Sequence, residues 1–260
     1  MTELRPGRLE KVRVLVTRPR ERAEELCFLL EDEGADVEVL PLLELLPPDN
    51  AKPLAAAAEH LHQYAWVVFA SPSAVEALVE ACRAAGTLPR LMETKIGVVG
   101  PGTSRTVRSY GLAVTLESEL KTGEGLLDAL IALVAPGVEI LLPAAQEGRT
   151  ELADGLLEHG AQVTRVAAYK STPRVPDAGL LAALKAEPPG VVLLASPRTA
   201  DALLEVLGED AAAVLQRTRL IAVGPTTARA LTERGWAPQA VADEPTAAAL
   251  VEAAVRAVHG

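Results

Sequence analysis

Residues 65–72, Ala-Trp-Val-Val-Phe-Ala-Ser-Pro, return as residues 190–197, Gly-Val-Val-Leu-Leu-Ala-Ser-Pro. Each stretch joins a short apolar run to a serine and a proline, a pattern typical of a buried strand followed directly by a helix. A second pair, Ile-Gly-Val-Val-Gly-Pro at 96–101 and Ile-Ala-Val-Gly-Pro at 221–225, recurs at nearly the same separation. A repeat of about 125 residues is too long for a solenoid and predicts a duplicated α/β unit.

Two further pairs extend the repeat, because Val12–Val16 resembles Val138–Leu142 and Gly34-Ala35 returns as Gly160-Ala161. Short β-branched runs alternate with longer Ala- and Leu-rich stretches of helical period, which indicates βα units and parallel sheets. Strands are predicted at 12–16, 37–40, 65–69, 95–99, 138–142, 163–169, 191–195 and 220–223. Helices are predicted at 21–33, 72–85, 102–110, 125–134, 150–159, 197–207, 226–234 and 246–258.

Two proline-containing stretches, 41–53 and 172–176, interrupt this pattern. Proline favours extended chain and stops helices, so these stretches are the expected crossings between two lobes. Two crossings leave one lobe discontinuous. The predicted division is residues 1–40 with 174–260 as lobe 1, 50–168 as lobe 2, and 41–49 and 169–173 as connectors.

Composition narrows the classes of function. A chain of 260 residues with 49% hydrophobic residues can form two cores and is not disordered. A net charge of −10 argues against nucleic acid or an anionic membrane as a partner bound by a broad basic face. A small anion remains compatible, because backbone amides at helix N-termini can bind it.

Cellular location follows from simple features of the chain. Cys27 and Cys82 show no CxxC spacing, so reduced core thiols are expected. The N-terminal stretch 1–11 carries charges and a Pro-Gly pair instead of an apolar signal segment, and no run approaches the ~20 apolar residues that span a bilayer. A cytoplasmic protein without a membrane partner is therefore expected.

Four predicted strands are followed directly by similar two-residue motifs, two Ser-Pro pairs and two Gly-Pro pairs. Ser71-Pro72 and Ser196-Pro197 place a hydroxyl at an N-cap and a proline at the first helical position. Gly100-Pro101 and Gly224-Pro225 place a flexible turn and a proline before Thr103 and Thr226. Any one of them can be a plain helix cap. Four together, at carboxyl ends of parallel strands, favour anion binding.

Three other side chains could take part in chemistry. Arg18 and Arg149 are either solvated loop arginines or residues that bind a carboxylate through two parallel hydrogen bonds. Tyr169, which ends a predicted strand, is either a packing residue or a proton donor. The sequence Gly100-x-Gly102-x-x-Arg105 lacks the last glycine of a dinucleotide fingerprint and does not follow the first strand, so nicotinamide binding is not expected.

Taken together, these residues resemble the uroporphyrinogen-III synthase family over essentially the whole chain. The matching segments are Val-Leu-Val-Thr-Arg-Pro at 14–19, Phe-Ala-Ser-Pro-Ser-Ala-Val at 69–75, Val-Ala-Ala-Tyr at 166–169 and Ala-Val-Gly-Pro-Thr-Thr-Ala-Arg-Ala-Leu at 222–231. The last segment is the most specific. Position 70 is Ala where many members have Thr or Ser.

The resemblance implies two α/β lobes with parallel sheets flanked by helices, joined by a two-stranded connector, with the active site in the cleft. It implies that linear hydroxymethylbilane loses water and closes to uroporphyrinogen III, the last pyrrole ring being inverted through a spiro intermediate. No metal or organic cofactor is expected. The substrate is a polycarboxylate, which agrees with the predicted anion-binding helix starts.

Tyr169 is the candidate proton donor, and a monomer is expected. The candidate substrate-binding residues are Arg18, Ser71, Gly100, Thr103, Arg149, Ser196, Gly224, Thr226 and Thr227. The alternative is a non-catalytic two-lobed binding protein for a small anion, since a cleft lined by helix N-termini would serve that role equally well. The missing export signal weighs against the periplasmic form of such a protein.

Overall fold

The computed structural model describes residues 7–260, apart from the side chain of Glu21. Residues 1–6, which the sequence analysis assigned to lobe 1, lie outside the described residues. The chain divides into unit 1, Met1–Glu44 with Thr172–Gly260, and unit 2, Leu45–Ser171. Within residues 7–260, every helix is too short or too polar to cross a lipid bilayer.

Unit 2 is built on parallel strands in the order β8-β7-β4-β5-β6. Their bounds are β4 Trp66–Phe69, β5 Lys95–Val98, β6 Leu116–Glu117, β7 Glu139–Ala145 and β8 Gln162–Pro173, the last running on into unit 1. One face of the sheet is covered by α2 (Lys52–Glu59), η2 (Leu61–Gln63), α3 (Pro72–Ala85), α4 (Leu88–Glu93) and α5 (Pro101–Ser109). The other face is covered by α6 (Gly123–Ile131) and α7 (Glu151–Glu158).

Strand β4 shows why the sheet is covered on both sides. Val67 and Phe69 pack into the core beneath α3, whereas Trp66 and Val68 pack into the core beneath α6. Successive side chains of a strand point to opposite faces, so a strand that is apolar at every position needs helices on both.

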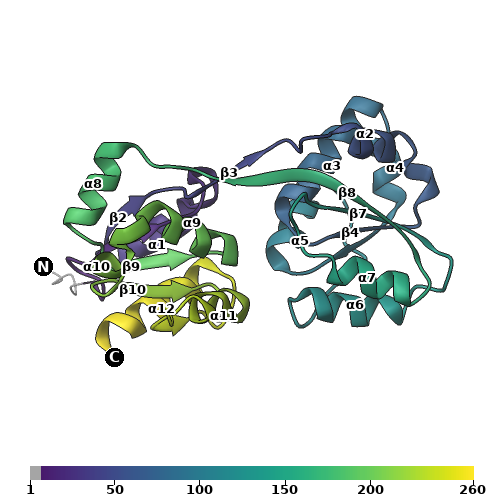
Figure 1. Cartoon of the computed structure of the whole chain (residues 1–260). Helices are drawn as coiled ribbons and strands as arrows, with labels where there is room; N and C mark the ends of the chain where they lie inside the picture. Colours follow the sequence, from purple (N-terminus) through teal and green to yellow (C-terminus); the bar gives the residue numbers. More distant parts are fainter. Residues whose placement is uncertain (1–6) are drawn as a thin grey trace, which may run out of the picture. The chain divides into compact units, whose positions relative to one another are not determined.

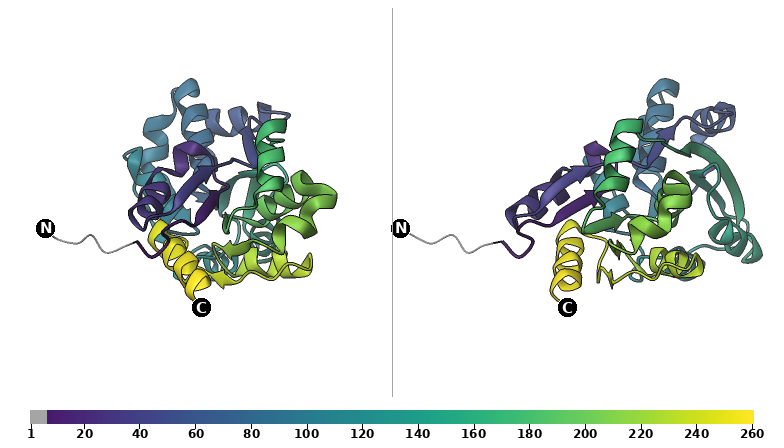
Figure 2. Two further views of the ribbon diagram at one scale, coloured as in Figure 1. Left: turned by 90° about the vertical axis from the view of Figure 1, so that its left-hand side faces the viewer. Right: turned by 60° about the vertical axis from the view of Figure 1, so that its left-hand side comes forward.

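Unit 1 has strands in the order β2-β1-β9-β10-β11. Their bounds are β1 Arg13–Val16, β2 Asp36–Val39, β9 Val191–Leu194, β10 Arg219–Ala222 and β11 Ala240–Val241. One face carries α1 (Glu24–Asp32) and α12 (Ala247–His259), which pack together although they lie near opposite ends of the chain (Figures 1 and 2). The other face carries α8 (Ala178–Ala186), α9 (Pro197–Leu207), α10 (Ala211–Leu215) and α11 (Pro225–Glu233). Two short 3-10 helices, η1 (Arg20–Arg22) and η3 (Gly208–Asp210), complete the unit.

The duplicated halves of the sequence are exchanged between the units. The first copy gives β1 and β2 to unit 1 but β4, β5 and β6 to unit 2. The second copy gives β7 and β8 to unit 2 and returns β9, β10 and β11 to unit 1. Each unit therefore combines half of one copy with the complementary half of the other, and the two strand orders correspond position by position.

The predicted fold class is confirmed, with one local correction. The stretch 41–53 was expected to be a plain interruption, but it contains β3 (Leu43–Leu46), and α2 begins at Lys52 with Pro53 in its first turn. Proline is favourable at that position of a helix. Strand β3 lies beside β8, so the two crossing segments form the expected two-stranded connector (Figure 1). The helices α2, α4, α8 and α10 and the two-residue strands β6 and β11 were not predicted.

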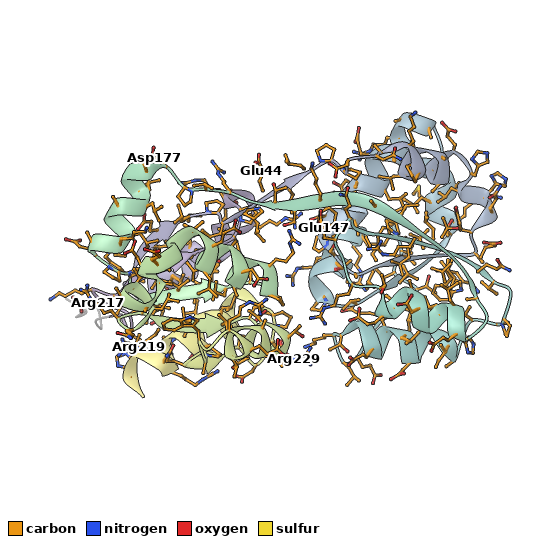
Figure 3. All side chains as sticks on the ribbon, viewed as in Figure 1. Glu44, Glu147, Asp177, Arg217, Arg219 and Arg229 are labelled. Carbon is orange, nitrogen blue, oxygen red and sulfur yellow. The ribbon has the colours of Figure 1, made fainter. Side chains whose placement is uncertain are left out.

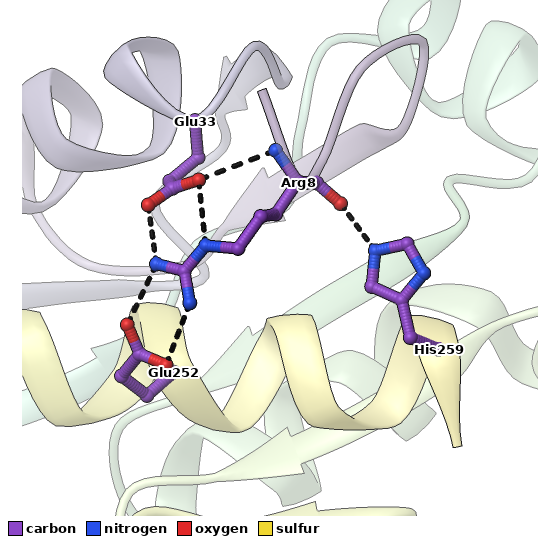
Figure 4. A network of polar contacts seen from close by, with 4 residues as sticks. All are labelled: Arg8, Glu33, Glu252 and His259. Atoms are coloured by element: carbon purple, nitrogen blue, oxygen red, sulfur yellow. Dashed lines mark hydrogen bonds and ion pairs between the residues drawn. The ribbon is translucent and has the colours of Figure 1, made fainter. Parts of the chain in front are cut away.

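Unit 1 has a cluster of polar contacts close to both chain ends (Figure 4). The Arg8 guanidinium binds the carboxylate of Glu33, at the end of α1, and that of Glu252 on α12 at 2.7 and 2.9 Å. The ring Nε2 of His259 lies 2.6 Å from the Arg8 carbonyl oxygen. Hydrogen bonds from Arg8 are the main reason that the pKa values of Glu33 and Glu252 are lowered.

Candidate active site

Tyr169 lies within β8, level with the carboxyl end of β7, on the face of the unit 2 sheet that α3 covers. Up to that point β8 alternates regularly, with Val163 against the α6 core and Val166 and Ala168 against the α3 core. The register then shifts, because Ala144 pairs with Ala167 but Ala145 pairs with Tyr169. This extra residue is a β-bulge, and it turns Tyr169 to the same face as Ala168.

The Tyr169 hydroxyl meets the start of helix α3. Its Oη lies 3.1 Å from Oγ of Ser71, the N-cap residue. The same Oγ accepts a hydrogen bond from the backbone N–H of Ala74 at 3.3 Å. The predicted proton donor and one predicted binding residue are therefore in direct contact, both only partly buried.

A second set of contacts fixes the backbone on either side of Tyr169. The Asp49 carboxylate accepts hydrogen bonds from Lys170 at 2.6 Å and from the Gln146 side chain at 2.7 Å. The Gln146 backbone N–H donates to the Tyr169 carbonyl at 2.8 Å. The pKa of Asp49 is lowered, mainly by the hydrogen bond from Lys170. Sequence analysis missed this cluster because its members are far apart in the chain and belong to no motif.

The two Gly-Pro helix starts have no side-chain cap. Gly100 and Gly224 are the N-cap residues of α5 and α11, and both have fully extended backbones that any residue can adopt. The expected flexible turn is therefore an extended N-cap at both positions. A Cβ on Gly224 would meet nothing within 4 Å, so the space in front of α11 is open on the side of that atom.

A threonine follows three residues after each of these glycines. Thr103 is 5% exposed and Thr227 is 2% exposed. Within residues 7–260, neither side-chain hydroxyl has a hydrogen-bond partner. Neither oxygen is among the fully buried polar atoms that lack one, so both hydroxyls keep contact with solvent although the residues are buried. Thr226, in contrast, is exposed.

The Ser-Pro start in unit 1 is capped by its own side chains. Ser196 Oγ accepts from the Thr199 backbone N–H at 3.2 Å and also lies 2.8 Å from the Thr199 hydroxyl. Plain capping accounts for both of these contacts. Ser71 in unit 2 has the same backbone cap, but its second partner is Tyr169.

Arg18 is the predicted binding residue that burial affects most. It follows β1, whose end is fixed by a hydrogen bond of 2.7 Å from the Thr17 hydroxyl to the Leu193 carbonyl. Burial lowers the pKa of Arg18, and the charge of Glu25 opposes that shift. No hydrogen bond or ion pair holds the guanidinium within the described part of the chain. A partly desolvated cation without such a partner is suited to bind an anion.

Arg149 is exposed, in the loop after β7 that also carries Glu147 (Figure 3). Arg165 stabilises this loop, because its guanidinium donates hydrogen bonds to the carbonyls of Ala145 at 2.9 Å and Gly148 at 3.0 Å. Arg165 was not among the predicted residues. No feature of the sequence distinguishes it from a solvated arginine on β8.

The candidate residues fall into two groups, one in each unit. Unit 2 places Ser71, Gly100, Thr103 and Arg149 after the carboxyl ends of β4, β5 and β7, and Tyr169 within β8, level with the last residue of β7. Unit 1 places Arg18, Ser196, Gly224, Thr226 and Thr227 after the carboxyl ends of β1, β9 and β10, the strands equivalent to β7, β4 and β5. Open parallel sheets bind ligands at this edge. Among the described residues, no three His, Cys, Asp or Glu side chains are arranged to hold a metal ion.

These features define a class of protein with a duplicated α/β fold, a helix start without a side-chain cap in each unit, and one tyrosine hydroxyl in contact with a capping serine. A family model described as uroporphyrinogen-III synthase HemD matches residues 24–252. A protein of Methanothermobacter thermautotrophicus, provisionally named as a uroporphyrinogen-III synthase, is 34% identical over 85% of this chain and 88% of its own length. A uroporphyrinogen-III synthase of Synechococcus elongatus is 27% identical over 82% of this chain and 83% of its own.

Solved structures agree in fold. A mutant uroporphyrinogen III synthase from Thermus thermophilus has a TM-score of 0.67 at 22% identity, covering 95% of this chain and 98% of that one. The enzyme from Helicobacter pylori has a TM-score of 0.64 at 20% identity, covering 94% and 99%. The chain belongs to the uroporphyrinogen-III synthase family. The resemblance seen in the sequence is thus confirmed, and so is the assignment to an enzyme of porphyrin biosynthesis.

Proposed function

We propose that this chain cyclises hydroxymethylbilane to uroporphyrinogen III with loss of water, as a lyase, and that Tyr169 is its proton donor. The position of the Tyr169 hydroxyl supports this role. It lies level with the carboxyl end of β7, turned by a bulge to the face that α3 covers and in contact with the N-cap serine of α3. Parallel sheets commonly bind ligands beside such strand ends.

The reaction needs one proton at the leaving group. As the C–O bond of the hydroxymethyl group breaks, the Tyr169 phenol gives its proton to the departing hydroxyl, which leaves as water. The resulting cation is conjugated with its pyrrole. The substituted carbon of the last ring then attacks it and forms the new C–C bond of the spiro intermediate. The original bond from that carbon to the neighbouring methylene bridge then breaks, and the methylene bonds to the free α-carbon of the same ring, which inverts the ring. The proton lost from that α-carbon as the ring regains aromaticity restores the phenol.

Binding of the substrate carboxylates is assigned to donors in both units. The starts of α5 and α11, which have no side-chain cap, offer backbone N–H groups and the hydroxyls of Thr103 and Thr227, which have no partner among the described residues. Arg18 adds a half-buried positive charge, whereas exposed Arg149 adds a weaker, salt-screened one. Ser196 and Thr226 contribute smaller hydrogen bonds.

The alternative, a binding protein without catalysis, gains no support from the relatives cited above, since all of them carry the name of an enzyme or of a biosynthetic protein. We further propose that the protein acts as a monomer in the cytoplasm. The free thiols of Cys27 and Cys82 support that location, because the cytoplasm keeps thiols reduced. Sedimentation of the purified protein would test the monomer.

The decisive experiment measures turnover of hydroxymethylbilane and the ring isomer of the product. The wild-type chain should give uroporphyrinogen III, whereas closure without the enzyme gives the uninverted isomer. Tyr169→Phe should slow closure by about 10-fold or more, the effect of losing a general acid. Tyr110→Phe is the matched control, because Tyr110 packs against the same core but far along α5 from its start. A Tyr169→Phe rate within about twofold of wild type would remove the acid role.

A further inference from the structure

We infer that Ser71 is a positioning residue for Tyr169, and that its hydroxyl donates a hydrogen bond to the Tyr169 Oη. This inference rests on the proposed role of Tyr169 as proton donor. It replaces the predicted role of Ser71 as a direct substrate ligand.

Oγ of Ser71 has one hydrogen and two lone pairs. One lone pair is used by the Ala74 backbone N–H, 3.3 Å away. The hydroxyl hydrogen and the second lone pair remain, and Tyr169 Oη lies within reach at 3.1 Å, where either oxygen can be the donor. Ser71 Oγ thus contacts the Ala74 N–H of its own helix and the Tyr169 hydroxyl at the same time.

The direction of the hydrogen bond matters for chemistry. If the phenol donated to Ser71, its hydrogen would be used inside the protein and would not face the substrate. Donation from Ser71 instead leaves the phenol hydrogen available for the leaving hydroxyl. The 14-residue helix α3 also places the positive end of its dipole at Ser71, which stabilises the negative charge that develops on Oη as the proton leaves.

Unit 1 supplies an internal comparison. Ser196 forms the same backbone cap, but its hydroxyl pairs with the neighbouring Thr199 hydroxyl at 2.8 Å. The residue equivalent to Thr199 in unit 2 is Ala74, which has no hydroxyl. The alanine leaves Ser71 free to bind Tyr169, so the arrangement is specific to the unit that carries the phenol.

The test combines four variants, Ser71→Ala, Ser71→Thr, Tyr169→Phe and the double variant Ser71→Ala/Tyr169→Phe, each assayed for kcat and KM with hydroxymethylbilane. Ser71→Ala should lower kcat about fivefold, the effect of losing one neutral hydrogen bond, with KM unchanged. Ser71→Thr keeps the hydroxyl and the cap and should restore kcat. In the Tyr169→Phe background, Ser71→Ala should have no further effect, because the two residues act as one unit.

Thr122→Ala controls for the loss of a helix cap. Thr122 caps α6 in the same unit through an N–H bond of 3.1 Å from Gly125, and its removal should lower Tm like Ser71→Ala without lowering kcat. Suppose instead that Ser71→Ala raises KM alone, or slows Tyr169→Phe by the same factor as wild type. The positioning role is then wrong, while the slow Tyr169→Phe variant still supports the acid. If Tyr169→Phe itself turns over at the wild-type rate, both proposals fall together.

Discussion

Strand β8 in unit 2 runs unbroken over Gln162–Pro173, whereas the equivalent stretch of unit 1 is divided into β2 and β3. Pro41 lies in the gap between β2 and β3, and the second copy has Ala167 at the corresponding position. Proline has no backbone N–H to pair and rarely continues a strand. One substitution between the copies thus explains why only one of them extends a strand to the sheet edge.

The two copies also differ in side chains near the bulge and at the start of the following helix. Tyr169 corresponds to Leu43 in the first copy, and Ala74 corresponds to Thr199 in the second. The capping serine is the same in both units. The duplicated fold therefore provides similar helix starts in both units, whereas the proposed chemistry depends on a few positions at which the copies differ.

The first prediction tests whether the proline difference between the copies explains the continuity of β8. Ala167→Pro makes the second copy like the first at this position. Ala167→Pro should interrupt β8 next to the bulge, lower stability by about 2 to 3 kcal/mol and displace Tyr169, with activity falling at least as far as in Tyr169→Phe. Thermal unfolding and hydroxymethylbilane turnover would measure both effects. Ala167→Val, a good strand former, is the control. Full activity in a folded Ala167→Pro protein would show that strand continuity does not position the phenol.

A second change tests what the units share. Thr103→Val and Thr227→Val each remove one unpartnered hydroxyl at equivalent positions of α5 and α11. Each should weaken product binding by roughly 1 kcal/mol, and the double variant by roughly 2 kcal/mol if the sites are independent. Calorimetric titration would measure this. Equal affinity of the double variant and wild type would mean that these helix starts do not bind the ligand.

A third prediction tests whether the residue three positions after each capping serine decides the partner of that serine. Ala74→Thr would give Ser71 the local partner that Ser196 has in unit 1, and should lower kcat by about fivefold. Ala74 is fully buried, so some loss of stability from added volume is expected as well. Ala74→Val adds similar volume without a hydroxyl and is the control. If both variants lose the same activity, packing and not the hydroxyl explains the loss.

The smallest effect concerns pH. Hydrogen bonds from Arg8 lower the pKa values of Glu33 and Glu252 in the folded chain below their ordinary value of 4.5. This contribution to stability is therefore present above about pH 4.5 and is lost as the pH falls through the lower folded values. These groups are exposed, so the effect should be slight.

Hydrogen exchange followed separately in each unit between neutral and acidic pH would measure this dependence. Arg8→Gln should make unit 1 less sensitive to acid without changing the response of unit 2. An unchanged acid response of unit 1 in Arg8→Gln would contradict the prediction.

Much of this architecture was predictable because it depends on local sequence. Apolar runs such as 65–69 and the Ser-Pro and Gly-Pro pairs mark strand ends and helix starts without reference to the rest of the chain. The repeat then indicated which strands are equivalent. Short helices such as α4 and α10 have too few turns to show a clear period, which is why they were missed.

The arrangement at Tyr169 could not be predicted in the same way. The bulge arises from the pairing of β7 with β8, two strands whose register cannot be read from either alone. By alternation from Val163, Tyr169 would have pointed to the α6 face, away from Ser71. The isolated charge of Arg18 likewise depends on neighbours from distant segments. The difference between Ala74 and Thr199 was present in the aligned repeats, but its meaning depends on the tyrosine opposite.

The exchange of halves between the units has a consequence for the order in which the chain is made. Unit 2 is continuous from Leu45 to Ser171, so all of its strands are translated before β9. Strands β1 and β2 emerge first, yet β1 pairs with β9, and the Arg8 contact needs Glu252. Strand β1 can pair with β2 early, but it is among the last strands to find all of its partners. A released fragment that ends at residue 190 should protect unit 2 from protease while β1 and α1 are still cleaved.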